Sequence, residues 1–575
     1  MRLPPEILGI VFTMVQGVLV TSPFAIGDRV SSTKERKTIY RPPPSYQWLT
    51  ILHICESWRN IALNTSYLWN TIILEPRVCP HFDIREFTAG IPSPTAFLDL
   101  SGRHQPLNMK IYAPYLSSAS AASLLRNLHR VKRLELSGDF NPEEDGIDLL
   151  PLSVPNVQVL ILHATTVDSN VFRQRTSGQP ECNSTVFGGD IQHLQSLSLS
   201  SSSMFLALQF QMPKLRQLYL DSLSASTYAT VDIAQSLFEL LNSIPELEDL
   251  IISRSAMPQY TYVRWTRRVY LPKLRRLILN RVSDMGTLLE RFELPDTLSM
   301  TCVPVDSRPL NISQRHISHS DHFHITRVQL HFQGEYSALR GVGAHSAIRM
   351  LPMHTGSSGY PMALKETTAQ LTCDIASVMQ DHVDELWISA DTPSPDQCGV
   401  LDSVSGRPKA LTCHQQFLSG MFTIATETLK KLYLLAEDDA IQYRCLSALS
   451  SSCPALWDLY IRAPGYDNYL VQDLLPQVLW TRLCQGNPIR VLTVHIYGQQ
   501  HESGTITVDE SRWKGMLEHT MRPYVETMKV IVDPGSPRME LVPICQSQST
   551  GIWECPVWGD HPADDFCHSQ LLPRT

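Results

Sequence analysis

The sequence lacks the short motifs that mark most enzyme families. It contains no phosphate-binding glycine loop, no Gly-x-Ser-x-Gly elbow, no His-Glu-x-x-His helix and no dinucleotide-binding glycine pattern. It also has no apolar run of the roughly 20 residues that a membrane helix needs. We therefore expect a protein that is not an enzyme, uses no cofactor and has no membrane segment.

Long runs of one charge are missing as well. Charged residues make up 18% of the 575 residues and leave a formal net charge of only -8. Proteins that bind nucleic acid usually concentrate lysine and arginine in a basic patch, so we expect no nucleic-acid partner. Hydrophobic residues make up 43% of the sequence, which is enough for a folded chain. At this length the chain needs several domains or one repetitive array.

The 13 cysteines show no repeated spacing. Several lie within apolar runs, such as residues 52–58 and 371–375, which is typical of reduced and buried thiols. We therefore expect the protein in the cytoplasm, the nucleus or both.

One apolar stretch, residues 7–20 after Arg2, is similar to a secretory signal. Pro4, Pro5 and Glu6 interrupt its head, where a signal keeps an unbroken apolar helix. Three Asn-x-Ser/Thr sequences also match the glycosylation pattern, which chance alone can give in a chain of this length. A secreted repeat protein is therefore the least favoured alternative. The three sequences begin at Asn64, Asn183 and Asn311.

Histidines are dense in only one place, residues 316–324. Zinc sites usually combine histidine with thiolate or carboxylate ligands, and only Asp321 is close by in the sequence. The cysteines near the C-terminus have no zinc-finger spacing. We therefore expect no metal site and interpret the histidine segment as a solvated loop. The residues concerned are His316, His319, His322 and His324, and near the C-terminus Cys545, Cys555, Cys567 and His568.

Two helical patterns lie within the first 75 residues. The first begins near Pro5, because proline is tolerated in the first turn of a helix and Glu6 is favourable at its positive end. Its apolar positions form one broad stripe. The second pattern covers about residues 48–62. Residues 21–45 between them are rich in proline, serine and charge, which predicts an exposed loop. The stripe of the first pattern consists of Ile7, Leu8, Val11, Phe12 and Val15.

These two patterns resemble the F-box, in the form that precedes leucine-rich sequence in mushroom-forming fungi. The likeness lies in two blocks: Leu-Pro-Pro-Glu-Ile-Leu at residues 3–8 with Ile-Val-Phe at residues 10–12, and Leu-His-Ile-Cys-Glu-Ser-Trp-Arg-Asn-Ile-Ala at residues 52–62, which closes with Leu68 and Trp69. The resemblance implies a small helical bundle over residues 1–75 that docks on the Skp-type adaptor of a cullin-RING ubiquitin ligase. By motif position, the adaptor-binding residues would be Leu3, Pro4, Ile7, Leu8, Leu52, Cys55 and Trp58.

The size of this module also points to a partner. A bundle of about 50 structured residues cannot bury both faces of its helices, so some apolar surface should contact another protein. The alternative is that the same side chains fill the core of the module or pack on the rest of the chain.

A repeated unit extends through the remainder of the sequence. It has the Leu-x-x-Leu-x-Leu signature of leucine-rich repeats, in which alternate apolar side chains of a short strand enter a shared core. Residues 231–242, between two copies, have helical spacing. The clearest copies are residues 155–162, 213–220, 245–252, 272–279 and 454–461, and weaker ones are 131–136, 194–199, 383–388, 429–434 and 489–494.

Strands alternating with helices predict an α/β fold, here a curved solenoid of parallel strands over residues 95–535. Residues 308–373 show the signature poorly and predict an irregular sector, and residues 536–575 form a tail. The exposed residues between the inward leucines should make the target-binding face, or else pack on their cross-strand neighbours. The aromatic members that we expect to contact a target are Tyr219, Trp387, Tyr433 and Tyr460.

These features together predict a substrate-recognition subunit. The N-terminal module would hold a Skp-type adaptor, and the solenoid would hold a target protein near ubiquitin-transfer machinery in other subunits. Tethering of this kind raises effective concentration and needs no reactive group in the receptor. The main alternative is a leucine-rich scaffold without ligase association.

Overall fold

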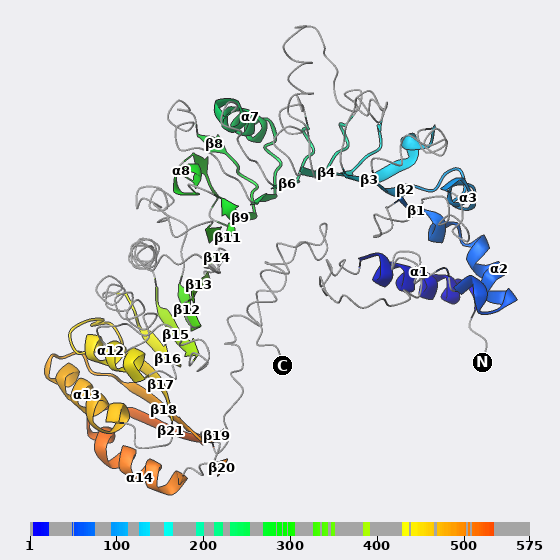
Figure 1. Cartoon of the computed structure of the whole chain (residues 1–575). Helices are drawn as coiled ribbons and strands as arrows, with labels where there is room; N and C mark the ends of the chain where they lie inside the picture. The colour runs from blue at the N-terminus through cyan, green and yellow to red at the C-terminus, as the bar shows by residue number, and fades with distance from the viewer. Residues whose placement is uncertain are drawn as a thin grey trace, which may run out of the picture. The chain divides into compact units, whose positions relative to one another are not determined.

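Parallel strands that carry the repeated sequence unit dominate this α/β fold (Figure 1). The predicted loop beyond Thr21, the histidine segment 316–324 and the tail 536–575 lie outside the described residues. The computed structural model describes residues 4–21, 49, 51–74, 94–112, 126–138, 154–164, 191–199, 212–221, 230–253, 268–282, 285–289, 291–295, 297–304, 326–333, 336–342, 347–350, 383–391, 428–435, 439–464, 469–498, 500–501, 504–505 and 509–533.

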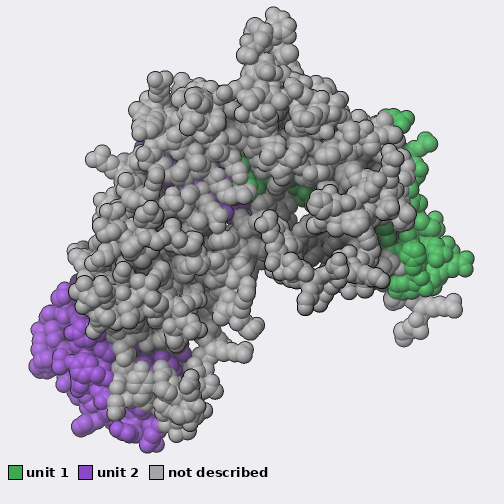
Figure 2. All heavy atoms as spheres, viewed as in Figure 1, with its two compact units in different colours: residues 1–248, 554–575 green, residues 249–553 purple. Residues whose placement is uncertain are grey.

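The chain divides into two compact units, residues 1–248 with 554–575 and residues 249–553 (Figure 2). In the first unit, helices precede a run of strands that pair in chain order, β1-β2-β3-β4-β5-β6, all parallel. Its elements are α1 (Pro5–Thr21), α2 (Glu56–Asn64), the 3-10 turn η2 (Ser66–Trp69), β1 (Thr71–Leu74), α3 (Pro94–Leu100), β2 (Leu107–Tyr112), η5 (Leu128–Arg130), β3 (Val131–Gly138), β4 (Val159–Ala164), β5 (Ser196–Leu199), β6 (Gln217–Asp221) and α7 (Thr230–Ser243).

The register of the first unit aligns the leucines of successive repeats. Leu160 pairs with Leu134 on one side and with Leu197 on the other, and all three are buried. Each repeat therefore adds its apolar side chains to a single core, as the Leu-x-x-Leu-x-Leu spacing predicts. The helical spacing of residues 231–242 is confirmed as well, since α7 covers it.

A tight turn precedes the strand in each of the clearest copies. In residues 154–157 the amide of Val157 donates to the carbonyl of Val154 across 3.1 Å, with Pro155 second in the turn. Proline suits that position because its fixed φ matches the turn. The first and last residues of these turns are buried, so the bend itself contributes to the core. The same hydrogen bond recurs from Leu215 to Met212, Leu247 to Ile244, Leu274 to Leu271 and Leu456 to Cys453.

The second unit has parallel strands too, but with an antiparallel insert. Strands β7, β9, β11 and β14 pair in parallel, β13 pairs antiparallel with both β14 and β12, and β12-β15-β16-β17-β18-β21 continue in parallel. The antiparallel strands lie in the segment where the repeat signature is poor. The elements are β7 (Asp249–Ser253), β8 (Val269–Tyr270), β9 (Arg276–Val282), α8 (Met285–Leu289), β10 (Phe292–Glu293), β11 (Ser299–Pro304), β12 (Arg327–Gln333), β13 (Tyr336–Val342), β14 (Ala347–Met350), β15 (Glu385–Asp391), β16 (Lys431–Leu434), α12 (Asp439–Leu449), β17 (Asp458–Pro464), the π-helical turn η9 (Leu470–Leu474), α13 (Leu475–Cys484), β18 (Val491–Tyr497), β19 (Gln500–His501), β20 (Gly504–Thr505), α14 (Glu510–Met521), η10 (Arg522–Tyr524) and β21 (Thr527–Asp533).

Helices α12, α13 and α14 lie side by side along the last strands (Figure 1). Arg482 of α13 is 1% exposed and holds the segment that follows α12. Its guanidinium donates to the carbonyls of Leu449 and Ser452 at 3.0 and 2.8 Å, and to those of Cys453 and Leu456 at 2.9 and 3.0 Å. Cys453 has a φ of 57°, so these bonds fix a turn that its own backbone disfavours.

Candidate functional site: two candidate binding surfaces

The N-terminal helical module, α1 with α2 and η2, is held together by aromatic side chains. The ring of Phe12 on α1 lies 5.2 Å from that of Trp58 on α2, between centroids. Trp69 is fully buried and donates its Nε1 proton to the carbonyl of Ala62 at 2.9 Å. The core continues to α3, where the ring of Phe97 lies 5.3 Å from that of Trp69 between centroids. These contacts hold the module together through buried side chains, without its exposed apolar ones.

Helix α1 buries one face and exposes another. Leu8 and Phe12 are 9% and 1% exposed and contribute to the core of the module. Four other apolar side chains of the same helix have the i, i+3, i+4, i+7 spacing of a single face. We call this face the α1 stripe; it consists of Ile7, Ile10, Val11 and Met14, which are 43%, 48%, 39% and 64% exposed.

The predicted adaptor-binding residues of the first block fall on different sides of the module. Pro4 is exposed, and Ile7 belongs to the α1 stripe. Leu8 points into the core instead, and Leu3 lies outside the described residues. Ile10 belongs to the first motif block, but neither Ile10 nor Met14 is among the predicted adaptor-binding residues, because the apolar pattern of this helix does not reveal which face is covered.

The predicted residues of the second block also help to build the module. Leu52 is half-buried, and Trp58 is half-buried against Phe12. Cys55 is exposed, and its Sγ accepts the backbone N–H of Trp58 at 3.5 Å at the start of α2. The nearby Ile54 is 57% exposed.

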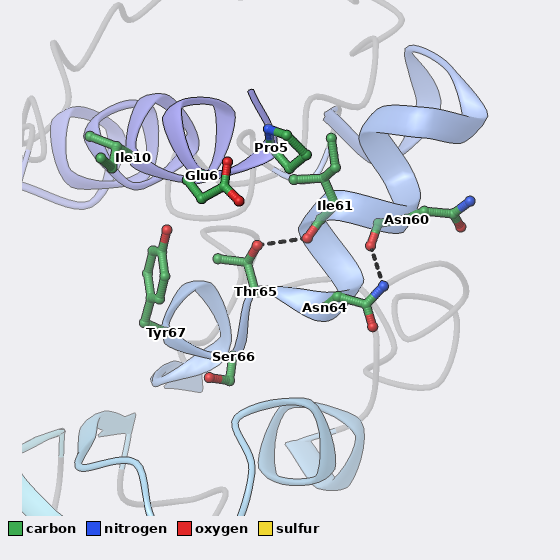
Figure 3. A pocket seen from close by; sticks show the side chains of 9 residues that line it. All are labelled: Pro5, Glu6, Ile10, Asn60, Ile61, Asn64, Thr65, Ser66 and Tyr67. Carbon is green, nitrogen blue, oxygen red and sulfur yellow. Dashed lines mark hydrogen bonds between the residues drawn. The ribbon is translucent and has the colours of Figure 1, made fainter. Parts of the chain in front are cut away.

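A pocket of about 660 Å³ opens between α1, the end of α2 and η2 (Figure 3). The Tyr67 hydroxyl lies so close to α1 that a Cβ on residue 9 would come within 2.6 Å of it, so Gly9 is required for this approach. Internal bonds fix the end of α2: the Thr65 hydroxyl donates to the Ile61 carbonyl at 2.6 Å. The lining residues are Pro5, Glu6, Ile10, Asn60, Ile61, Asn64, Thr65, Ser66 and Tyr67.

The second candidate surface is a row of aromatic side chains on β15, β16 and β17. Trp387 pairs in register with Tyr433, and Tyr433 with Tyr460. We call these three residues the aromatic row. The first two rings stack with centroids 3.7 Å apart and planes 4° from parallel, and the next two lie 5.7 Å apart. Three of the four aromatic residues predicted for target binding are thus brought together.

The facing sides of the Trp387 and Tyr433 rings cover each other, which satisfies the cross-strand packing expected of exposed strand aromatics. The rings of Tyr433 and Tyr460 are tilted by 35°, and the ring of His495 lies edge-on to Tyr460 at 84°. The Trp387 indole N–H donates to the Glu385 carboxylate at 2.6 Å. Burial raises the pKa of the neighbouring Asp458 carboxyl, an effect that Lys431 opposes and Glu385 reinforces.

The row ends at a histidine on β18. The Tyr460 hydroxyl lies 2.6 Å from Nδ1 of His495, whose Nε2 lies 3.8 Å from the Asp533 carboxylate. Burial and the nearby Arg462 lower the pKa of His495, while Asp533 opposes that change. Burial also raises the pKa of Tyr460. In the tautomer that carries its proton on Nε2, His495 accepts a hydrogen bond from the Tyr460 hydroxyl at Nδ1.

Tyr219 differs from the other aromatic residues predicted for target binding. It lies on β6 in the first unit and is only 3% exposed. Its register partner Ser198 is fully buried as well. Both faces of this part of the sheet are covered, so Tyr219 is not available to a partner, contrary to the expectation from strand alternation.

Among the described residues, no group of three or more His, Cys, Asp or Glu side chains is placed to hold a metal ion. No helix in the described part is both long and apolar enough to cross a membrane. No protein-family model matches this chain, and no curated protein matched it in a sequence search.

Proposed function

We propose that this chain is the substrate-recognition (F-box) subunit of a cullin-RING ubiquitin ligase. In this proposal the N-terminal helical module binds a Skp-type adaptor, and the strands of a leucine-rich solenoid hold a target protein. The motif resemblance of residues 3–12 and 52–62 supports the choice of adaptor. Catalysis would take place in other subunits.

The observation that carries this proposal is the α1 stripe. Four large apolar side chains share one helix face and are 39% to 64% exposed, although the helix already buries Leu8 and Phe12 in the module. Contiguous apolar surface of this kind marks protein–protein contacts. A helix laid against a complementary apolar surface is contacted through this i, i+3, i+4, i+7 set.

The aromatic row supports the second half of the proposal. Tyr and Trp are enriched where proteins recognise one another, because each combines a large area with a hydrogen-bonding tip. The row lies on consecutive parallel strands, which is where repeat proteins usually bind their partners. We therefore assign target contact to Trp387, Tyr433 and Tyr460, and leave out the buried Tyr219.

Co-purification tests the proposal. The full chain is co-expressed with a Skp-type adaptor, as wild type and as the double variant Ile7→Glu, Met14→Glu. We expect the wild type to retain the adaptor and the variant to lose it, because two carboxylates would be buried in an apolar contact. A wild-type chain that never retains the adaptor would favour the leucine-rich scaffold without ligase association.

A further inference from the structure

The pocket beside the α1 stripe suggests what kind of group it receives. We propose that it takes a lysine or arginine side chain of the partner that docks on the N-terminal helical module. This inference rests on the proposed function, since the partner in question is the adaptor. It adds a cationic contact to an interface otherwise described by apolar residues.

The charge of the pocket comes from Glu6. Its carboxylate points into the space between α1, α2 and η2 (Figure 3). Within the described residues this carboxylate has no hydrogen bond or ion pair. None of the lining residues is basic, so the chain itself supplies no counter-charge among them.

The end of α2 strengthens the preference for a cation. The pocket lies at the carboxyl end of this helix, which carries a partial negative charge. The backbone carbonyl of Asn60 already accepts from Asn64 Nδ2 at 2.8 Å, which leaves the Asn64 side-chain oxygen as an acceptor at the pocket. The pocket also borders the first turn of α1, whose partial positive charge is offset by Glu6 itself. The α2 end and the Asn64 amide oxygen then favour positive charge over negative.

The walls of the pocket fit the stem of a long basic side chain. Ile10, Ile61 and the ring of Tyr67 provide apolar surface next to the Glu6 carboxylate. Lysine and arginine bury their methylene stems on apolar surface while the charged head stays at a polar site. A carboxylate or phosphate group would face Glu6 without any compensating cation. A purely apolar side chain would leave Glu6 partly desolvated without a partner, which is costly.

Gly9 gives the pocket its shape. Any side chain at this position would displace the Tyr67 hydroxyl from α1, because an added Cβ would lie 2.6 Å from that oxygen. Gly9→Ala should therefore move one wall of the pocket while the Glu6 charge stays in place. This variant separates the effect of pocket shape from the effect of charge.

The test is a titration of the purified full-length chain with a Skp-type adaptor. We compare wild type, Glu6→Gln, Gly9→Ala and the matched control Glu510→Gln. Glu510 is also exposed in the first turn of its helix, α14 in the second unit, so the control loses the same charge and the same helix-end interaction away from the N-terminal helical module. We expect Glu6→Gln to weaken binding about tenfold and Glu510→Gln to leave it within about twofold.

A salt titration and a double-mutant cycle test whether the effect of Glu6→Gln comes from an ion pair with the adaptor. The difference between wild type and Glu6→Gln should shrink when salt rises from about 0.05 to about 0.5 M, because exposed charge pairs are screened. One lysine or arginine of the adaptor, replaced by methionine, should then lose its effect in the Glu6→Gln background. Equal affinities of wild type and Glu6→Gln would overturn the inference while the proposed function stands. A wild type that binds no adaptor would overturn the proposed function, and this inference with it.

Discussion

The α1 stripe and the aromatic row both hold large apolar side chains away from the core. The side chains of the row contact one another and form hydrogen bonds within the chain, whereas those of the stripe stay exposed. Trp387 and Tyr433 stack on each other at 3.7 Å, and the polar tips of Trp387 and Tyr460 have partners in Glu385 and His495. The stripe residues Ile7 and Met14 remain 43% and 64% exposed on a helix that already has a packed face. Unmet apolar area is the stronger sign of an external partner.

Mutations in the row and in the stripe should therefore affect different quantities. Changes in the row and its support should first lower the free energy of unfolding of the second unit, because those side chains rest on one another. Changes in the stripe should lower the affinity for a partner and leave the free energy of unfolding nearly unchanged.

Arg482→Met should have the largest effect, on stability alone. The variant leaves four backbone carbonyls without their shared donor, next to the strained turn at Cys453. We expect the free energy of unfolding to fall by about 3–5 kcal/mol, measured by urea denaturation. The control is Arg490→Met, whose side chain is 64% exposed and lies 3.8 Å from the Glu526 carboxylate. Equal losses in the two variants would contradict the account of Arg482.

The double variant Ile7→Glu, Met14→Glu should reduce adaptor affinity by about a hundredfold or more. Its free energy of unfolding should change by less than about 1 kcal/mol, because both side chains are exposed in the free chain. Leu483→Glu on α13 is a matched control, with a leucine that is 39% exposed in the second unit. Full adaptor binding by the double variant would remove the stripe from the interface.

Leu8→Glu should behave in the opposite way. Leu8 is 9% exposed, so a charge there would be buried in the core of the module and should destabilise it. We expect the variant to lose the near-ultraviolet signal of the packed module tryptophans together with adaptor binding. A Leu8→Glu chain that keeps this signal but no longer binds the adaptor would mean that Leu8 contacts the adaptor and that the α1 stripe is not the whole binding surface.

Trp387→Ala should destabilise the second unit by about 1–2 kcal/mol, since it removes a stacked cross-strand pair and the area that pair buries. Adaptor binding should stay as in the wild type. Trp480→Ala is the matched control because Trp480 is 55% exposed. A lower adaptor affinity of Trp387→Ala would contradict the expectation that the aromatic row affects stability and the α1 stripe affects adaptor binding.

The smallest expected effect is a pH dependence from His495. Burial and Arg462 hold its pKa below the ordinary value of 6.5, so the unfolded chain binds the proton more readily than the folded one. The resulting stability is complete above pH 6.5 and is lost as the pH falls through the folded pKa. His495→Gln should flatten the difference in unfolding free energy between pH 7.5 and about 5.5. An unchanged pH dependence in this variant would mean that other groups cause it.

The repeated strands could be predicted from the sequence because their cause is local. An apolar-Pro-x-apolar turn followed by alternating leucines specifies a bend and a strand whose inward side chains face one core. The structure repeats this arrangement, for example at Val154 to Leu160 and at Ile244 to Leu250. The antiparallel pairing of β12, β13 and β14 was not predicted, since the sequence there shows only a weak repeat signature.

The candidate sites were predictable only in part. Register follows from the repeat, so the alignment of Trp387, Tyr433 and Tyr460 could be expected. Exposure could not, because strand alternation does not show whether an outward side chain is covered, and Tyr219 is only 3% exposed. The pocket joins Glu6 to residues about 55 positions later in the chain, and no local pattern links them. The role of Arg482 was also not predictable, because its guanidinium donates to backbone carbonyls that lie 26 to 33 residues earlier in the chain.

The most direct test of the central claim is hydrogen exchange of the full chain with and without a Skp-type adaptor. The account predicts slower exchange on adaptor addition in α1 and α2, residues 5–21 and 56–64, and unchanged exchange in β15, β16 and β17. Protection found only in those three strands, or no protection anywhere in the chain, would contradict the claim that the N-terminal helical module is the adaptor-binding surface.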